Sequence, residues 1–156
     1  MDVSRRKALK TGGGAALLGA LFAAGFIKPE DALAADWNKA AFGGKTMADT
    51  LQAMGAGSPA QSTSIAITAP DIAENGAVVP VGVQSSLPKT ESIAILIEKN
   101  PNMLAASFDL PAGTEPVVGT RVKMGQTSNV YAVVKADGKY YTAVKEIKVT
   151  LGGCGG

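Results

Sequence analysis

The stretch SIAILIE, residues 92–98, is the most continuously apolar part of the chain after its N-terminal segment. Isoleucines at positions 93, 95 and 97 would line one face of a β-strand, because successive side chains of a strand point to opposite faces. Ala94 and Leu96 make the other face apolar as well. The pattern indicates a strand that is covered on both sides, either inside the core or at a subunit interface, with the core favoured.

Residues 62–151 continue this pattern as short β-branched runs separated by turn residues. Asp137-Gly138 is the clearest hairpin turn, and Asn75-Gly76 also tolerates positive φ. Pro80 cannot donate to a ladder, so its strand is expected to lie at an edge or to carry a bulge. We predict an all-β domain, an immunoglobulin-like antiparallel β-sandwich of about seven strands. The predicted strands are 64–69, 77–83, 92–98, 105–110, 117–124, 129–135 and 140–151.

Residues 35–61 form a short N-terminal helical segment in this interpretation. Met47, Leu51 and Met54 fall on one face of a helix placed within residues 36–56. Thr46 can cap that helix, since Asp49 follows three residues later, and Gly55 provides a stop. The apolar face predicts that the helix packs on the main body.

Residues 1–34 have the composition of an export signal that is later removed. The paired Arg5 and Arg6 resemble a twin-arginine signal, and the small-residue site Ala32-Leu33-Ala34 follows an apolar run. That run spans only about 13 residues, whereas a membrane-spanning helix needs about 20. We expect cleavage after Ala34 and a periplasmic mature protein without a membrane anchor.

The charge of the whole chain is +2, and the signal accounts for all of it. The mature chain would carry a net charge of about zero. It therefore lacks the basic excess with which proteins bind nucleic acid or anionic membrane surfaces. We predict neither partner.

The chain contains no histidine and a single cysteine, Cys154. This composition excludes the commonest ligand sets for zinc, copper, haem and iron-sulfur clusters, so no metal or other cofactor is expected. It also leaves a serine or cysteine nucleophile without its usual histidine base. We predict that the protein is not an enzyme.

The last five residues, 152–156, surround the only thiol of the chain with four glycines. Glycine loses more conformational freedom on ordering than other residues do, so this arm is expected to be flexible. Fully extended, it would reach roughly 16 Å beyond the last strand. A thiol has an ordinary pKa of about 8.5, and the arm holds no basic residue, so activation must come from a partner protein. The candidate arm consists of Gly152, Gly153, Cys154, Gly155 and Gly156.

Two other interpretations apply to a C-terminus of this composition. A lone cysteine in an exported protein can be a disulfide cross-link or a dispensable thiol, but neither role explains four flanking glycines. A terminal Gly155-Gly156 pair can also become a thiocarboxylate after adenylation. That chemistry needs ATP, which the expected compartment lacks.

Several segments of the chain resemble the SoxY family, the carrier subunits of bacterial thiosulfate oxidation. The match includes the terminal motif GGCGG at 152–156 and extends over essentially the whole length. One departure is Asn102-Met103, where a second proline is expected before Leu104. The internal segments that carry the resemblance are Ala73-Glu74-Asn75-Gly76, Val79-Pro80, Lys99-Asn100-Pro101 and Arg121-Val122-Lys123-Met124.

The resemblance implies a heterodimer with a SoxZ subunit, which would be exported together with this chain. It also implies that Cys154 holds thiosulfate-derived sulfur covalently and presents it to SoxAX, SoxB and SoxCD type enzymes. The alternative is a structural or binding immunoglobulin-like subunit whose cysteine is only a disulfide cross-link.

Overall fold

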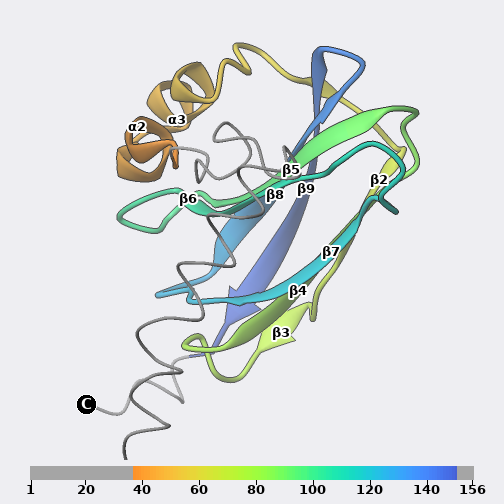
Figure 1. Ribbon diagram of the computed structural model, residues 1–156. Coiled ribbons are helices and arrows are strands. Elements are labelled where there is room, and N and C mark those ends of the chain that lie inside the picture. Colours follow the sequence, from red (N-terminus) through yellow and green to blue (C-terminus); the bar gives the residue numbers. More distant parts are fainter. Residues whose placement is uncertain (1–36, 151–156) are drawn as a thin grey trace, which may run out of the picture. The chain divides into compact units, whose positions relative to one another are not determined.

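A computed structural model describes residues 37–150 of the chain. Within this range, a compact unit that begins at Asn38 contains two helices followed by nine strands. The strands form two sheets that face each other, which confirms the predicted β-sandwich (Figure 1). The helices are α2 (Lys39–Gly43) and α3 (Met47–Ala53). The strands are β1 (Ala60–Gln61), β2 (Ile65–Thr68), β3 (Ile72–Ala73), β4 (Val79–Ser85), β5 (Thr90–Ile97), β6 (Leu104–Asp109), β7 (Val117–Val122), β8 (Ser128–Ala136) and β9 (Lys139–Val149).

The larger sheet has six strands in the order β1-β9-β8-β5-β6, with β3 also paired to β9, and the smaller sheet has the order β2-β4-β7. All seven predicted strands are present. The two that sequence reasoning missed, β1 and β3, are two residues long and run parallel to β9. Two residues are too few to show an alternating pattern, and a purely antiparallel sandwich has no place for them.

The core between the sheets is built from the alternating positions predicted for it. Ile93, Ile95 and Ile97 are fully buried and pack with inward-facing residues of β4 and β8. Ala94 and Leu96, on the opposite face of β5, are also buried, but in a separate apolar cluster with residues of both helices. The SIAILIE segment is therefore a central strand covered on both sides within this one chain.

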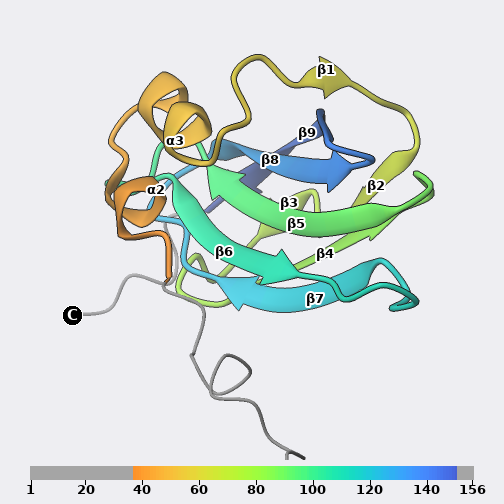
Figure 2. The ribbon, with the colours of Figure 1, turned by 45° about the horizontal axis from the view of Figure 1, so that its top comes forward.

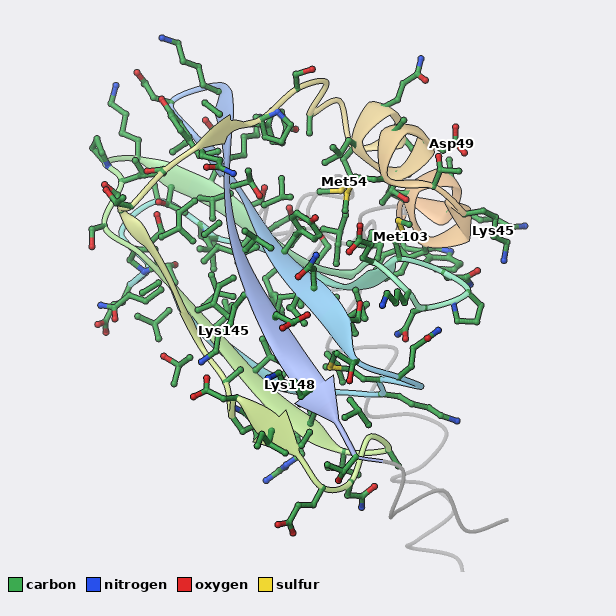
Figure 3. The ribbon with its side chains drawn as sticks, turned by 180° about the vertical axis from the view of Figure 1, so that it is seen from behind. Lys45, Asp49, Met54, Met103, Lys145 and Lys148 are labelled. Atoms are coloured by element: carbon green, nitrogen blue, oxygen red, sulfur yellow. The ribbon has the colours of Figure 1, made fainter. Side chains whose placement is uncertain are left out.

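The second cover is the helical segment, which lies on the outer face of the six-stranded sheet (Figure 2). Leu51 packs in the same cluster as Leu96, and the Tyr140 hydroxyl of β9 donates a hydrogen bond to the Met54 carbonyl at 2.8 Å. Figure 3 shows Met54 and Met103 on this helix-covered side. The helices thus hide an apolar face that would otherwise be exposed.

The single helix expected within residues 36–56 is two helices, because the chain turns at Gly43-Gly44. A side chain at Gly44 would collide with Thr50, so this turn packs too closely for any other residue. The predicted cap is confirmed: the Thr46 hydroxyl accepts a hydrogen bond from the Asp49 amide at 3.1 Å. Gly55 follows with a φ of 71°, as a helix stop requires.

The prediction for the Asp137-Gly138 turn and the prediction for the strand that contains Pro80 have different outcomes. Asp137 and Gly138 both have positive φ and join β8 to β9 in a tight hairpin, as expected. The prediction for Pro80 is wrong, because β4 is the middle strand of its sheet and pairs with β7 without a break in register. Pro80 is tolerated because β2 pairs with β4 only from Gly82 onward, so Pro80 has a strand on one side only.

Replacing Tyr140 by phenylalanine tests how firmly the helices are fixed to the sheet. The change removes one hydrogen bond and leaves the ring in place. The free energy of unfolding measured in urea should therefore fall by about 1 kcal/mol. Tyr141→Phe is the matched control, since no hydrogen bond from its hydroxyl is found within residues 37–150. Equal losses in the two variants would contradict this role of Tyr140.

Gly76→Ala tests the packing at the other end of β9. A methyl group there would overlap the Met124 carbonyl oxygen and would lie 2.8 Å from Cγ1 of Val149. Relieving that overlap must move backbone, so the variant should lose about 1–3 kcal/mol of stability in the same measurement. Gly125→Ala, where a methyl group meets no atom within 4 Å, should change stability by less than about 0.5 kcal/mol. A Gly76→Ala protein as stable as the Gly125→Ala protein would refute the close contact.

Candidate functional site

The candidate site lies at the C-terminal end of β9, where the chain continues toward the single cysteine. Cys154 and the glycines Gly152, Gly153, Gly155 and Gly156 lie outside the described residues. The predicted export signal with Arg5 and Arg6 also lies outside them. What the structure does describe is the point at which the arm is attached, up to Thr150.

One side of the attachment point is the short parallel strand β3. The Lys148 amide donates to the Asp71 carbonyl at 2.9 Å, and the Thr150 amide donates to the Ala73 carbonyl at 3.1 Å. Figure 3 shows Lys148 near the end of the β9 arrow, with Lys145 nearer the middle of the strand. Backbone hydrogen bonds therefore hold β9 up to the last described residue.

Val149 is held from a second direction. Its amide donates to the Thr127 hydroxyl at 3.0 Å, and its side chain packs against the main core. The Gly76 carbonyl accepts from the Met124 amide at 2.7 Å, which brings the turn after β3 and the segment after β7 together beside Val149. The end of β9 is thus enclosed by two loops and the core.

Lys145 fixes the approach to this region. Its ammonium group donates to the Ala69 carbonyl at 2.7 Å and pairs with the Asp71 carboxylate at 3.0 Å. Both partners lie in the segment that leads into β3. The side chain therefore ties the middle of β9 to the segment whose backbone holds the end of the same strand.

The internal segments that resemble the SoxY family meet at this end of the sandwich. Residues 73–76 contact residue 124, as described above, and the Asn100 side-chain amide donates to the Lys123 carbonyl at 2.8 Å. Val79 and Pro80 pair with Val122 and Arg121 across the smaller sheet. Segments that are far apart in the sequence therefore meet near the described end of β9.

The departure at Asn102-Met103 falls in a loop that contacts the helices. Asn102 accepts a hydrogen bond from the ammonium group of Lys45, and the Met103 amide donates to the Gly44 carbonyl at 3.4 Å. This loop therefore packs on the helical segment, and its variation leaves the contacts around residues 73–76 and 121–124 in place.

Sequence reasoning did not identify the residues that hold Val149 and Thr150 at the end of β9. Ala73 and Thr127 act through a backbone carbonyl and a hydroxyl, and neither position stands out by residue type. The resemblance of segments 73–76 and 121–124 was the available signal. Their proximity to β9 follows only from the tertiary structure.

Charged groups of both signs are exposed near the end of β9, among them Asp71, Glu74, Lys123 and Lys148. The perturbed ionisations lie at the opposite end of that strand, beside the β8–β9 hairpin. There a hydrogen bond from Lys135 lowers the pKa of Glu91, and one from Lys89 lowers the pKa of Asp137. These pairs join the β8–β9 hairpin to Lys89 and to the start of β5, at the opposite end of β9 from Thr150.

No group of three or more histidine, cysteine, aspartate or glutamate side chains within residues 37–150 is arranged to hold a metal ion. No helix in this range is long and apolar enough to cross a membrane.

Comparison with known proteins gives a family match and a structural match. The model of the SoxY family, described as "Sulfur oxidation protein SoxY", matches residues 51–154. The sulfur carrier protein SoxY from Chlorobium limicola f thiosulfatophilum is 45% identical in sequence, with a TM-score of 0.59, and the alignment covers 66% of this chain and 96% of that one. No curated protein sequence matches the chain.

A second solved structure shares the fold alone. Superoxide reductase (neelaredoxin) from Ignicoccus hospitalis has a TM-score of 0.51 and 20% identity, with 56% of this chain and 80% of that chain covered. At this identity the likeness indicates a common sandwich and carries no functional argument. The family model matches two thirds of the chain, from helix α3 to the terminal cysteine, and the chain belongs to the SoxY family of sulfur oxidation proteins.

Proposed function

We propose that this protein is a covalent carrier that holds sulfur intermediates of thiosulfate oxidation on Cys154 and presents them to enzymes in the periplasm. The observation that carries the proposal is the family match itself, which extends through residue 154 and so includes the only thiol of the chain. The related solved structure is named a sulfur carrier protein. Cys154 carries the intermediate, and the chemistry is left to partner enzymes.

The loading step joins thiosulfate to the thiol. A sulfur–sulfur bond forms between Sγ of Cys154 and the sulfane sulfur of thiosulfate, the thiol proton is released, and two electrons leave. A SoxAX type haem enzyme would accept those electrons. The product is a cysteine S-thiosulfonate with one negative charge.

The unloading step is a hydrolysis. Water adds to the terminal sulfonate sulfur, sulfate leaves with two protons, and a persulfide anion remains on Cys154. A SoxB type hydrolase would catalyse this step, and a SoxCD type enzyme would oxidise the remaining sulfane sulfur. Each step requires the same sulfur atom to enter a different active site, so the carrier must bring the thiol out to its partners.

The contacts at the end of β9 support the proposal that Cys154 carries the intermediate while partner enzymes catalyse the reactions. Thr150 is hydrogen-bonded to Ala73, and the neighbouring Val149 is bonded to Thr127 and packed on the core. The segment that bears Cys154 therefore follows a strand end that the folded domain holds in a fixed position. A SoxZ subunit is the proposed partner in the heterodimer, and the twin-arginine signal with Arg5 and Arg6 is the proposed route of export for the folded pair.

Replacing Cys154 by serine should abolish thiosulfate-dependent sulfate release, because serine cannot form the sulfur–sulfur bond. The stability measured by urea unfolding should stay within about 0.5 kcal/mol of the unmodified protein, since no core residue is touched. Intact mass spectrometry of the unmodified protein from thiosulfate-grown cells should show sulfur-containing adducts on Cys154. Sulfate release that survives in the serine variant would leave only a structural or cross-linking role for the thiol.

Deleting Gly152 and Gly153 tests whether reach matters when the thiol is retained. The deletion shortens the arm by about 7 Å in its extended form, so enzymes with deep pockets should turn over the carrier at least tenfold more slowly. A small alkylating reagent should still modify Cys154 completely, which shows that the thiol is present. A variant restored in length by two serines is the control, and it should recover most of the activity.

A further inference from the structure

The smaller sheet carries an open groove of about 470 Å³ that no function given so far uses. The groove crosses this sheet, in which β4 lies between β2 and β7 (Figure 1). The segment that follows β2 borders it on one side and the end of β7 borders it on the other. Most of its lining is apolar or glycine, and Arg121 is the one charged residue of that lining. The lining includes Ala69, Pro70, Pro80, Gly82, Gly119 and Arg121.

Two glycines lie on the outward face of the sheet in this groove, although the fold requires glycine at neither position. Gly82 of β4 and Gly119 of β7 are cross-strand partners, and neither has a positive φ. A methyl group at Gly119 would meet no atom within 4 Å, and one at Gly82 would make only ordinary contacts of 3.6 Å or more. Glycine weakens the interior of a strand and often marks a place where another backbone approaches closely. The pair therefore indicates that a segment of chain lies against this part of the sheet.

Arg121 is available to an anion in the same groove. Its side chain is exposed and makes no hydrogen bond or ion pair with any residue between 37 and 150. In register it lies opposite Pro80, beside the pair of glycines on the outward face. A guanidinium group can bind two oxygen atoms of an oxyanion at once. The groove thus combines a flat backbone surface with a cation that lacks a partner among the described residues.

The groove lies within reach of Cys154. Pro70, in its lining, directly precedes Asp71, whose carbonyl accepts a hydrogen bond from the Lys148 amide at 2.9 Å. Because paired strands are closely spaced, Pro70 is at most about 16 Å from Thr150. Cys154 follows Thr150 by four residues, so it can lie up to about 13 Å from Thr150. These distances are comparable, so an arm that turns back along the domain can bring Cys154 and its cargo to the groove.

We propose that this groove holds the protein's own C-terminal segment, residues 151–156, while Cys154 carries the S-thiosulfonate, a proposal that rests on the carrier function given above. The narrow glycine-rich backbone lies on Gly82 and Gly119, and the sulfonate oxygens bind the Arg121 guanidinium. An unloaded thiol offers Arg121 no oxyanion, so docking depends on the load. The groove therefore shelters the sulfur–sulfur bond from small thiols until an enzyme withdraws the segment.

The test measures how fast a small uncharged thiol removes the cargo. The full chain, paired with a SoxZ subunit, is treated with tetrathionate, which converts the Cys154 thiolate into the S-thiosulfonate and releases thiosulfate. The thiolate of 2-mercaptoethanol then attacks Sγ, thiosulfate leaves and a mixed disulfide forms, and intact mass spectrometry follows the loss of the adduct. A synthetic peptide of residues 151–156, loaded in the same way, gives the rate without a groove. The protein should react about tenfold more slowly than the peptide, as expected for a segment docked about nine-tenths of the time.

Two variants remove the two features of the groove separately. Arg121→Gln removes the cation, and Gly119→Val fills the groove with a side chain that strands favour, so the free energy of unfolding in urea should not fall. Both proteins should react within about twofold of the peptide. Lys139→Gln, which removes an exposed cation at the opposite end of β9 from Thr150, is the control and should keep the slow rate.

Equal rates in the unmodified, Arg121→Gln and Lys139→Gln proteins would overturn the proposal. Failure of either groove variant to pair with SoxZ would also overturn it, since this face would then be a subunit interface. Should the Gly119→Val protein not fold, the rate of the Arg121→Gln protein decides alone.

The same loaded proteins separate this proposal from the carrier function. A SoxB type hydrolase that released sulfate from neither the unmodified nor the Arg121→Gln protein would refute the carrier function. Normal sulfate release, together with a cargo that reacts as fast on the unmodified protein as on the peptide, would refute only the shelter in the groove.

Discussion

Burial of β5 on both of its faces is the constraint around which the rest of the structure is arranged. One face supplies the isoleucines of the sandwich core, and the other would expose Ala94 and Leu96 to water if nothing covered it. Each large apolar side chain removed from water stabilises the fold by roughly 1.5–3 kcal/mol. Covering this face therefore offsets the conformational entropy that is lost when two short helices become ordered. The helices are too short to be stable alone and depend on that sheet in return.

The C-terminal strand of this sandwich, β9, joins the core to the glycine-rich sequence that follows it. β9 is eleven residues long, pairs on one side with β8 from Lys139 to Ile147, and meets β1 and β3 on the other side. Its first residues follow the tight hairpin turn, and its last residues are held by hydrogen bonds and contacts from two loops. A carrier requires a well-held strand end before a glycine-rich sequence, because a short arm can deliver its thiol into a pocket only from a well-defined position.

The family-like segments have a structural meaning that their separation in the sequence conceals. Residues 73–76, 79–80, 99–101 and 121–124 lie at one end of the domain, linked by hydrogen bonds to one another or across β4 and β7. Gly76 shows why such a position is restricted, since any side chain there would enter the space of Met124 and Val149. The loop at Asn102-Met103, where the sequence departs from the family pattern, instead contacts the helical segment.

The sequence by itself determined the sandwich, its seven main strands, the helix cap at Thr46, the hairpin at Asp137-Gly138 and the presence of a single thiol among glycines. These features depend on local alternation, local turn geometry and composition, which a single sequence displays directly. Only the tertiary structure decided that the helices cover the second face of β5, that Pro80 is tolerated in a middle strand, and that β3 and Gly76 lie beside the end of β9. Such features arise from contacts between distant segments, because the parallel pairing of two-residue strands and the meeting of loops leave no periodic trace in the chain.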